Sequence, residues 1–435
     1  MKLKNSVLWR LFLTLLILFS TGVGAAIRAQ ENQETSGIAG ELMIQQAVDL
    51  AIEENLELKS FQESLGISRG QLTGARVFPT NPEFLFTYFN ANPSERSGRF
   101  SEYSLSLSQE FEIGGQRGDR TQVAQSTIDK VEAEIERIKW VLVGDVLGGF
   151  YQVLMQQERL DLSSRVILLT EDLVSLTENK FAAGYAPEFE VNFAKLELQT
   201  ALREKARVLN QLQVAKYTLN NLMARPWETE FIAIGDLSYQ PLSFDIERLK
   251  VYAVQNRSDL KALEFAQLTA RSEINLARSM NTPNLRFSLI YDKEFDKDRF
   301  GAMLSLPIRL FNRNQGDIAS SLAAQKTAEA GYSFLKFLIE KEIASSYSEV
   351  RLASKEVQLL EEGMLEPVEQ NLDLVQKAYQ RGEVEIIEVI TAQRNFVDIR
   401  TAYLVALYNF NFAIANLQKA LGGNLAEIGK LDRLE

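Results

Sequence analysis

The sequence predicts a mainly α-helical fold, two long antiparallel helical hairpins with four β-strands, and an internal repeat is the main reason. The stretch LSLSQEFEIGGQRGD, which begins at Leu105, returns as LSLPIRLFNRNQGD from Leu304, 199 residues later. Gly184 and Gly382, each placed between two helical stretches, recur at nearly the same spacing. A repeat of this length is longer than a solenoid unit. We therefore expect two similar halves that build one pseudo-symmetric object.

The chain begins with the pattern of an export signal. Lys2, Lys4 and Arg10 precede an apolar run over residues 11–19, and small residues follow as far as Ala29. A run this short does not span a bilayer as a helix. We expect residues 1–29 to be a signal peptide and expect no membrane-spanning helix in the rest of the chain.

The composition opposes several classes of function. The chain has no Cys, no His and a formal net charge of -11. It therefore lacks the usual ligands of zinc and soft transition metals, and it lacks a cysteine for a disulfide or a lipid anchor. An acidic chain is a poor partner for phosphates. We expect no metal site, no cofactor and no nucleic-acid partner, and the missing phosphate-loop and nucleophile-elbow patterns predict that the protein is not an enzyme.

Each half predicts a helix, two strands and a helical hairpin in that order. The first helix covers residues 42–76 and ends before Pro79, which cannot continue it. The four strands are expected at about residues 84–90, 100–112, 284–291 and 299–307. The whole chain divides into the signal peptide (1–29), a first repeat (30–225), an irregular connector (226–244), a second repeat (245–423) and a tail (424–435).

The strands have the length and the pattern of membrane strands. In residues 100–112 apolar side chains alternate with polar ones, so that each kind occupies one face. A tilted strand needs about 9 to 11 residues to cross a bilayer. Alternation alone leaves a second interpretation open, namely surface hairpins packed on a soluble core.

The helices are too long for a compact domain. Almost nothing interrupts a helix from residue 116 to 180 or from 317 to 381, and about 65 residues of helix extend roughly 100 Å. Gly184 and Gly382 are the expected turns at the tips, because glycine supplies the left-handed conformation that ends a helix. Such hairpins span a distance, whereas a soluble coiled coil would leave the four strands without a purpose.

Four strands cannot close a barrel by themselves. Open strand edges are not tolerated in lipid, so strands that cross a membrane require several copies of the chain. Two copies would supply eight strands and a filled interior, and three would supply twelve and leave a lumen. If the strands are transmembrane, a homo-oligomer follows.

The mature chain resembles the TolC family of outer membrane efflux channels, including the branch that serves heavy-metal and drug pumps. The resemblance rests on the tandem halves, on EFEIGGQRGDR and LPIRLFNRNQGD after the second strand of each half, and on the tip pattern YQRGEVEIIEVITAQRNF. It implies a homotrimer with a twelve-stranded barrel in the outer membrane lipid and a helical tunnel through the periplasm of a Gram-negative bacterium.

The resemblance also implies a function and partners. The protein would be a passive exit duct for metal ions, drugs or other toxic compounds, served by a periplasmic adaptor (a membrane fusion protein) and an inner-membrane pump of the RND type or similar. Two alternatives stay open: a periplasmic coiled-coil scaffold or adaptor, and the outer membrane channel of a type I secretion system.

Acidic residues at the second tip are the candidate pore constriction. In the family an acid stands six residues after the tip glycine, which is Glu388 here, and a second acid often stands three residues further on, where this chain has Thr391. Glu383 and Glu385 lie nearer the turn and are further candidates. Three copies would form rings of like charge that favour cations. Ordinary acids at a helix N-terminus are the alternative.

Two other sets of residues are candidates for contact and for bending. The resemblance makes Gly184, Glu190, Arg381 and Gly382 the residues that meet the adaptor. Where the strands give way to the helices we expect the chain to bend at Gly114, Gly115 and Pro307, because glycine and proline permit or impose such bends.

Overall fold

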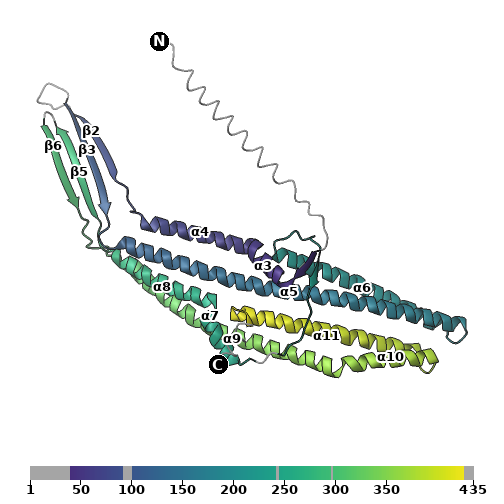
Figure 1. The fold of residues 1–435 in the computed structure, drawn as a ribbon. Helices are drawn as coiled ribbons and strands as arrows, with labels where there is room; N and C mark the ends of the chain where they lie inside the picture. Colours follow the sequence, from purple (N-terminus) through teal and green to yellow (C-terminus); the bar gives the residue numbers. More distant parts are fainter. Residues whose placement is uncertain (1–39, 92–99, 242–243, 295–296, 426–435) are drawn as a thin grey trace, which may run out of the picture.

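The computed structural model describes residues 40–91, 100–241, 244–294 and 297–425. The predicted signal peptide and nearly all of the predicted tail lie outside these residues. Figure 1 shows an elongated molecule with a small sheet at one end and the turns of two helical hairpins at the other.

The two halves have the same order of elements. The first half consists of β1 Gly40–Met43, α3 Ile44–Glu54, α4 Leu56–Arg76, β2 Glu83–Ala91, β3 Phe100–Phe111, α5 Gln116–Ala182 and α6 Glu188–Leu222. The second half consists of β4 Phe231–Ile234, α7 Ile246–Asn256, α8 Ser258–Ser279, β5 Leu285–Glu294, β6 Lys297–Ser305, α9 Gln315–Gly363, α10 Leu365–Arg381 and α11 Ile386–Leu421. Each half therefore runs from a short strand through two helices and a strand pair into a long hairpin.

The prediction of one helix over residues 42–76 is wrong, because the chain breaks at Asn55. The backbone leaves the helical region there, and the Asn55 side chain accepts a hydrogen bond from the N–H of Leu58, which caps α4. The Asn55 amide also donates to the carbonyl of Leu222 at the end of α6, over 2.9 Å. As a result α6 continues the line of α4 (Figure 1).

The second half repeats this joint with another residue. Arg257 has the same backbone conformation as Asn55, with φ near -60° and ψ 124°. Its Nη1 atom donates to the carbonyl of Ala420, near the end of α11, over 3.0 Å, and also to Glu342 of α9. Burial alone opposes the charge on Arg257, but its bonds to Asp259 and Glu342 outweigh burial and raise its pKa.

The connector between the halves is not wholly irregular, contrary to the prediction for residues 226–244. It contains β4, which pairs in parallel with β1. Further along, Tyr239 packs its ring against Phe410 at 4.9 Å and its hydroxyl lies 2.8 Å from that of Ser354. The connector therefore crosses the second hairpin and is fixed to it.

The four predicted strands form one antiparallel sheet in the order β2-β3-β5-β6. Each observed strand differs from the predicted range by a few residues, and β6 ends before Pro307. Paired residues share a face, and one face is apolar across all four strands: Phe84, Phe86, Tyr88, Tyr103, Leu105, Leu107, Phe111, Leu285, Phe287, Leu289, Tyr291, Phe300, Ala302 and Leu304. The opposite face carries mainly serines and charged residues, with Leu85, Phe89, Ile290 and Met303 as apolar exceptions. The outer edges of β2 and β6 have no partner strand among the described residues.

Side chains on the long helices form the core. Phe150 and Leu219 lie in the core of the first half, and Ile339, Phe410 and Leu417 lie in that of the second. Within the described residues, α5 alone contains an 18-residue window apolar enough to cross a bilayer by composition, which the sequence analysis did not foresee; half of that window is buried. The buried half of the window packs in the helical core, so its apolar composition does not by itself require a membrane.

The two hairpins differ in one respect. The helix α5 runs without a break, but the helix predicted over residues 317–381 is divided at Met364 into α9 and α10. Gly363 and Pro367 flank this break, and both disfavour a continuous helix.

Candidate functional site

The tips of the hairpins have the predicted glycine turns. Gly184 follows α5 with φ +79°, and Gly382 ends α10 with φ +78°. Both glycines are exposed. Residues with a side chain rarely adopt this left-handed backbone conformation, so glycine is the favoured residue in both turns.

A tyrosine that the sequence analysis missed connects the two tips. Tyr379 of α10 is buried among apolar residues of α6 and α11. Its hydroxyl donates to Glu190 Oε2 of α6 over 2.8 Å. Lys180 of α5 donates to the Tyr379 carbonyl, and its ammonium lies 3.8 Å from the centre of the Tyr379 ring. Burial raises the pKa of the Tyr379 hydroxyl to about 12, the Thr177 hydroxyl opposes this, and the bond to Glu190 adds to it.

The structure therefore gives Glu190, a predicted tip contact, an internal partner. It also shows how the signal could have been found: Tyr379 stands at helical spacing from Leu372 and Val375, in the apolar stripe of α10.

The candidate constriction residues all lie on the surface of the second tip. Glu383 forms an ion pair with Arg381, whose Nε atom is 3.0 Å away. Glu385 occupies the N-cap position of α11, and Glu388 lies in the first turn. Glu388 is exposed and has no ion pair among the described residues. Within the same residues, no three acidic side chains are grouped closely enough to hold a metal ion.

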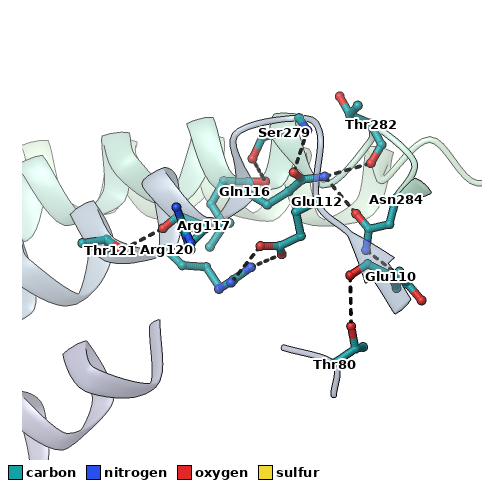
Figure 2. Close-up of polar contacts among 12 residues, drawn as sticks. Thr80, Glu110, Glu112, Gln116, Arg117, Arg120, Thr121, Ser279, Thr282 and Asn284 are labelled. Carbon is teal, nitrogen blue, oxygen red and sulfur yellow. Dashed lines mark hydrogen bonds and ion pairs between the residues drawn. The ribbon is translucent and has the colours of Figure 1, made fainter. Parts of the chain in front are cut away.

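The first junction between sheet and helix uses both predicted glycines. Gly115 is left-handed, with φ +82°, and begins α5. A side chain on Gly114 would place its Cβ 2.4 Å from that of Thr282, so only glycine fits. The buried side chain of Gln116 accepts from the Gly114 N–H at 2.8 Å and donates to the Thr282 carbonyl at 3.0 Å (Figure 2). Gln116 also donates to Asn284, which lies with Thr282 in the segment between α8 and β5.

The second junction repeats this geometry at residues that the sequence analysis did not single out. Asn314 is left-handed, with φ +60°, and begins α9. The side chain of Gln315 accepts from the Arg313 N–H at 2.8 Å, as Gln116 does in the first half. Asn314 therefore matches Gly115, and Pro307 lies in the exposed segment between β6 and this turn. Asparagine tolerates the left-handed region better than other side chains, which was the available signal.

The comparisons with known proteins agree with this architecture. The sequence profile of a family described as outer membrane efflux protein matches residues 47–225 and 251–423. This chain belongs to that family. As an outer membrane efflux protein of the TolC type, it lies in the outer membrane and extends into the periplasm.

Several individual relatives cover nearly the whole efflux protein. It is 24% identical over 387 residues to the cobalt-zinc-cadmium resistance protein CzcC of Cupriavidus metallidurans, covering 88% of this chain and 91% of CzcC. A solved structure of CusC, described as forming a transmembrane channel, aligns with a TM-score of 0.75 at 16% identity and covers 90% of this chain and 96% of CusC. A structure of the open MtrE channel of Neisseria gonorrhoeae aligns with a TM-score of 0.69 at 19% identity. The alignment covers 88% of this chain and 89% of MtrE. These structural matches confirm the helix-rich fold of the single chain.

Proposed function

We propose that three copies of this efflux protein form a twelve-stranded barrel in the outer membrane, continued by a helical tunnel. The sheet carries the proposal: it has an apolar face and a mainly polar one, and the outer edges of β2 and β6 are unpaired among the described residues. Unpaired edges are not stable in lipid. Pairing β6 of each copy with β2 of the next removes every edge, and twelve strands leave a lumen.

The barrel and the tunnel make up a passive duct. Solutes pass through it, and the energy comes from an inner-membrane pump of a tripartite system, connected through a periplasmic adaptor. The resistance named for CzcC supports divalent metal ions as one cargo. Toxic organic compounds, with drugs among them, are the other candidate class, since a relative from Pseudomonas putida is named a toluene efflux pump outer membrane protein.

The exposed tips form the proposed docking surface for the adaptor. Gly184, Arg381 and Gly382 lie at the turns. A groove between α5, α6 and α11 begins about three helical turns away from them along the hairpins, lined by residues that include Glu197 and Arg394. A helical hairpin of the adaptor fits such a groove, because its walls combine apolar and charged side chains.

The proposed constriction lies at the second tip. Threefold symmetry converts Glu388 into a ring of three like charges, and Glu383 and Glu385 add rings nearer the turn. The exposure of Glu388 supports this role. Such rings favour cations over anions.

The test is the size and conductance of the purified protein. We expect a trimeric mass in detergent and discrete single-channel steps in planar bilayers. A water-soluble monomer without conductance would support the scaffold interpretation instead. A deletion strain compared with its parent across metal salts, antibiotics and detergents identifies the cargo, and loss of secreted protein without altered resistance would indicate type I secretion.

A further inference from the structure

An apolar segment after β6 is unusually exposed. Leu306, Ile308, Leu310 and Phe311 have relative exposures of 49%, 81%, 62% and 91%. They lie at the sheet end of the molecule, between β6 and α9. An exposed row of large apolar side chains marks a surface that another molecule covers.

The internal repeat shows what this segment would become. The turns at Gly115 and Asn314 are equivalent in conformation and lie 199 residues apart, as do Leu105 and Leu304. Residues 306–310 therefore match residues 107–111, which are part of β3. Residues 107–111 form a strand because β5 pairs with them. Residues 306–310 have no strand on the equivalent edge among the described residues.

The strand registers extend the match to the partner strands. Glu83 lies opposite Ser108 in the first hairpin. Pro307 matches Ser108, and the register of β5 with β6, continued by two residues, places Asn284 opposite Pro307. Glu83 is thus the counterpart of Asn284.

The junction inside the chain then serves as a template. Glu110 of β3 accepts hydrogen bonds from Asn284 over 2.8 Å and from Arg286 over 3.2 Å; Figure 2 shows Glu110 next to Asn284. At the free edges Arg309 stands in the place of Glu110, and Glu83 stands in the place of Asn284. The contact between an acid and an amide inside the chain is therefore matched at the free edges by a base and an acid.

We propose that Arg309 of one copy forms an ion pair with Glu83 of the neighbouring copy, and that residues 306–310 extend β6 along the neighbour's β2. This proposal rests on the trimeric barrel proposed above and specifies its contact. The partner is a second copy of this chain, with Ile308 directly opposite Phe86 of the neighbour, as Gln109 is opposite Phe287 within the chain.

The charges of the free edges support this pairing. Within the described residues Arg309 has no ion pair. Glu83 lies 3.7 Å from Arg286, which also contacts Glu110 at 3.2 Å, so one cation serves two carboxylates. Arg309 of the next copy supplies the second cation. Each copy then contributes two acids and two bases to a neutral ring at the periplasmic end of the barrel.

Two experiments on the full-length protein in detergent test the contact. The chain has no cysteine, so the double variant F86C/I308C carries the sole thiols. We expect oxidation to link its copies, because directly opposite Cβ atoms lie about 4.5 to 5.5 Å apart. The matched control F84C/I308C is two residues out of register on the same face and is expected to link poorly. The second experiment reverses charges: R309E and E83R each lower the trimer-to-monomer ratio on the order of tenfold, and E83R/R309E restores it.

Each outcome has a separate meaning. Stronger cross-linking of F84C/I308C than of F86C/I308C overturns the register while the trimer stands. Cross-linking in register with no effect of charge reversal, or no rescue by the double variant, overturns the ion pair. A folded chain that is monomeric by mass and does not cross-link in either variant overturns the trimeric duct itself.

Discussion

The hydroxyl of Tyr379 connects the two tips, and Y379F tests whether this bond keeps them closed. The substitution removes one hydrogen bond, to Glu190. It keeps the ring and the bond from Lys180, which goes to the backbone carbonyl. A hydrogen bond to a charged group is worth about 1.5 to 3 kcal/mol. Glu190 is half-exposed, so in the variant water can hydrogen-bond to its carboxylate in place of the tyrosine. We therefore take the lower limit, about 1.5 kcal/mol, as the loss of stability of the closed state, which corresponds to about a tenfold lower closed-to-open ratio.

Single-channel recording in planar bilayers measures this ratio, and pH supplies an independent signal. The pKa of Tyr379 is raised from 10.0 to about 12. A raised pKa means that the stabilisation is fully present below pH 10 and is lost as the pH rises through 12. We therefore expect the wild-type channel to open across this range, and we expect Y379F to have a closed-to-open ratio about tenfold lower at neutral pH and to lack the alkaline step.

Tyr185, which is 85% exposed at the first tip, supplies the control. Y185F should behave like the wild type at every pH. A Y379F channel that has the wild-type closed-to-open ratio at neutral pH and retains the alkaline step would refute the proposed role of the hydroxyl.

Three further predictions concern the pore, a joint and a junction. E388Q should reduce the cation preference in bilayers, and unchanged selectivity would remove Glu388 from the constriction. Alanine at Arg257 leaves the half-buried Asp259 and the partly exposed Glu342 without their cation and should lower the free energy of unfolding by about 1 to 3 kcal/mol. Alanine at Lys250, whose ion pair with the exposed Glu247 lies at the surface, should change the stability far less; equal thermal shifts would contradict this. G114A forces a clash and should cost about 1 to 3 kcal/mol, while G118A has open space and should not destabilise.

The sequence was most informative where a pattern is local. Alternation located the strands of the four-stranded sheet to within a few residues, and the glycine rule located both tips. Prediction failed where a distant contact decides the structure. Asn55 is a common N-cap residue and caps α4 locally, but its bond to the Leu222 carbonyl of α6 is a distant contact, and β4 pairs with the distant β1. Neither contact leaves a mark in the residues near the break or in the connector.

The candidate site shows the same division. Gly114 and Gly115 were found because glycine identifies its own backbone role, and Asn314 was missed because asparagine has many other roles. Tyr379 was missed because it acts between hairpins that are almost 200 residues apart in the chain. The correspondence of Arg309 with Glu110, and of Glu83 with Asn284, could be recognised only by combining the repeat with the strand registers.

The end-to-end joints at Asn55 and Arg257 have a mechanical consequence. Each hairpin contains one arm that meets the sheet through a joint of side-chain hydrogen bonds, and in the first hairpin the other arm, α5, is covalently continuous from sheet to tip. A displacement of the tips can be absorbed by rotation at the joints, while the continuous arm keeps its length and its anchorage. In the proposed trimer, such joints would make the tube stiff along its axis and compliant in twist, so that the end formed by the hairpin tips could open while the barrel stays still.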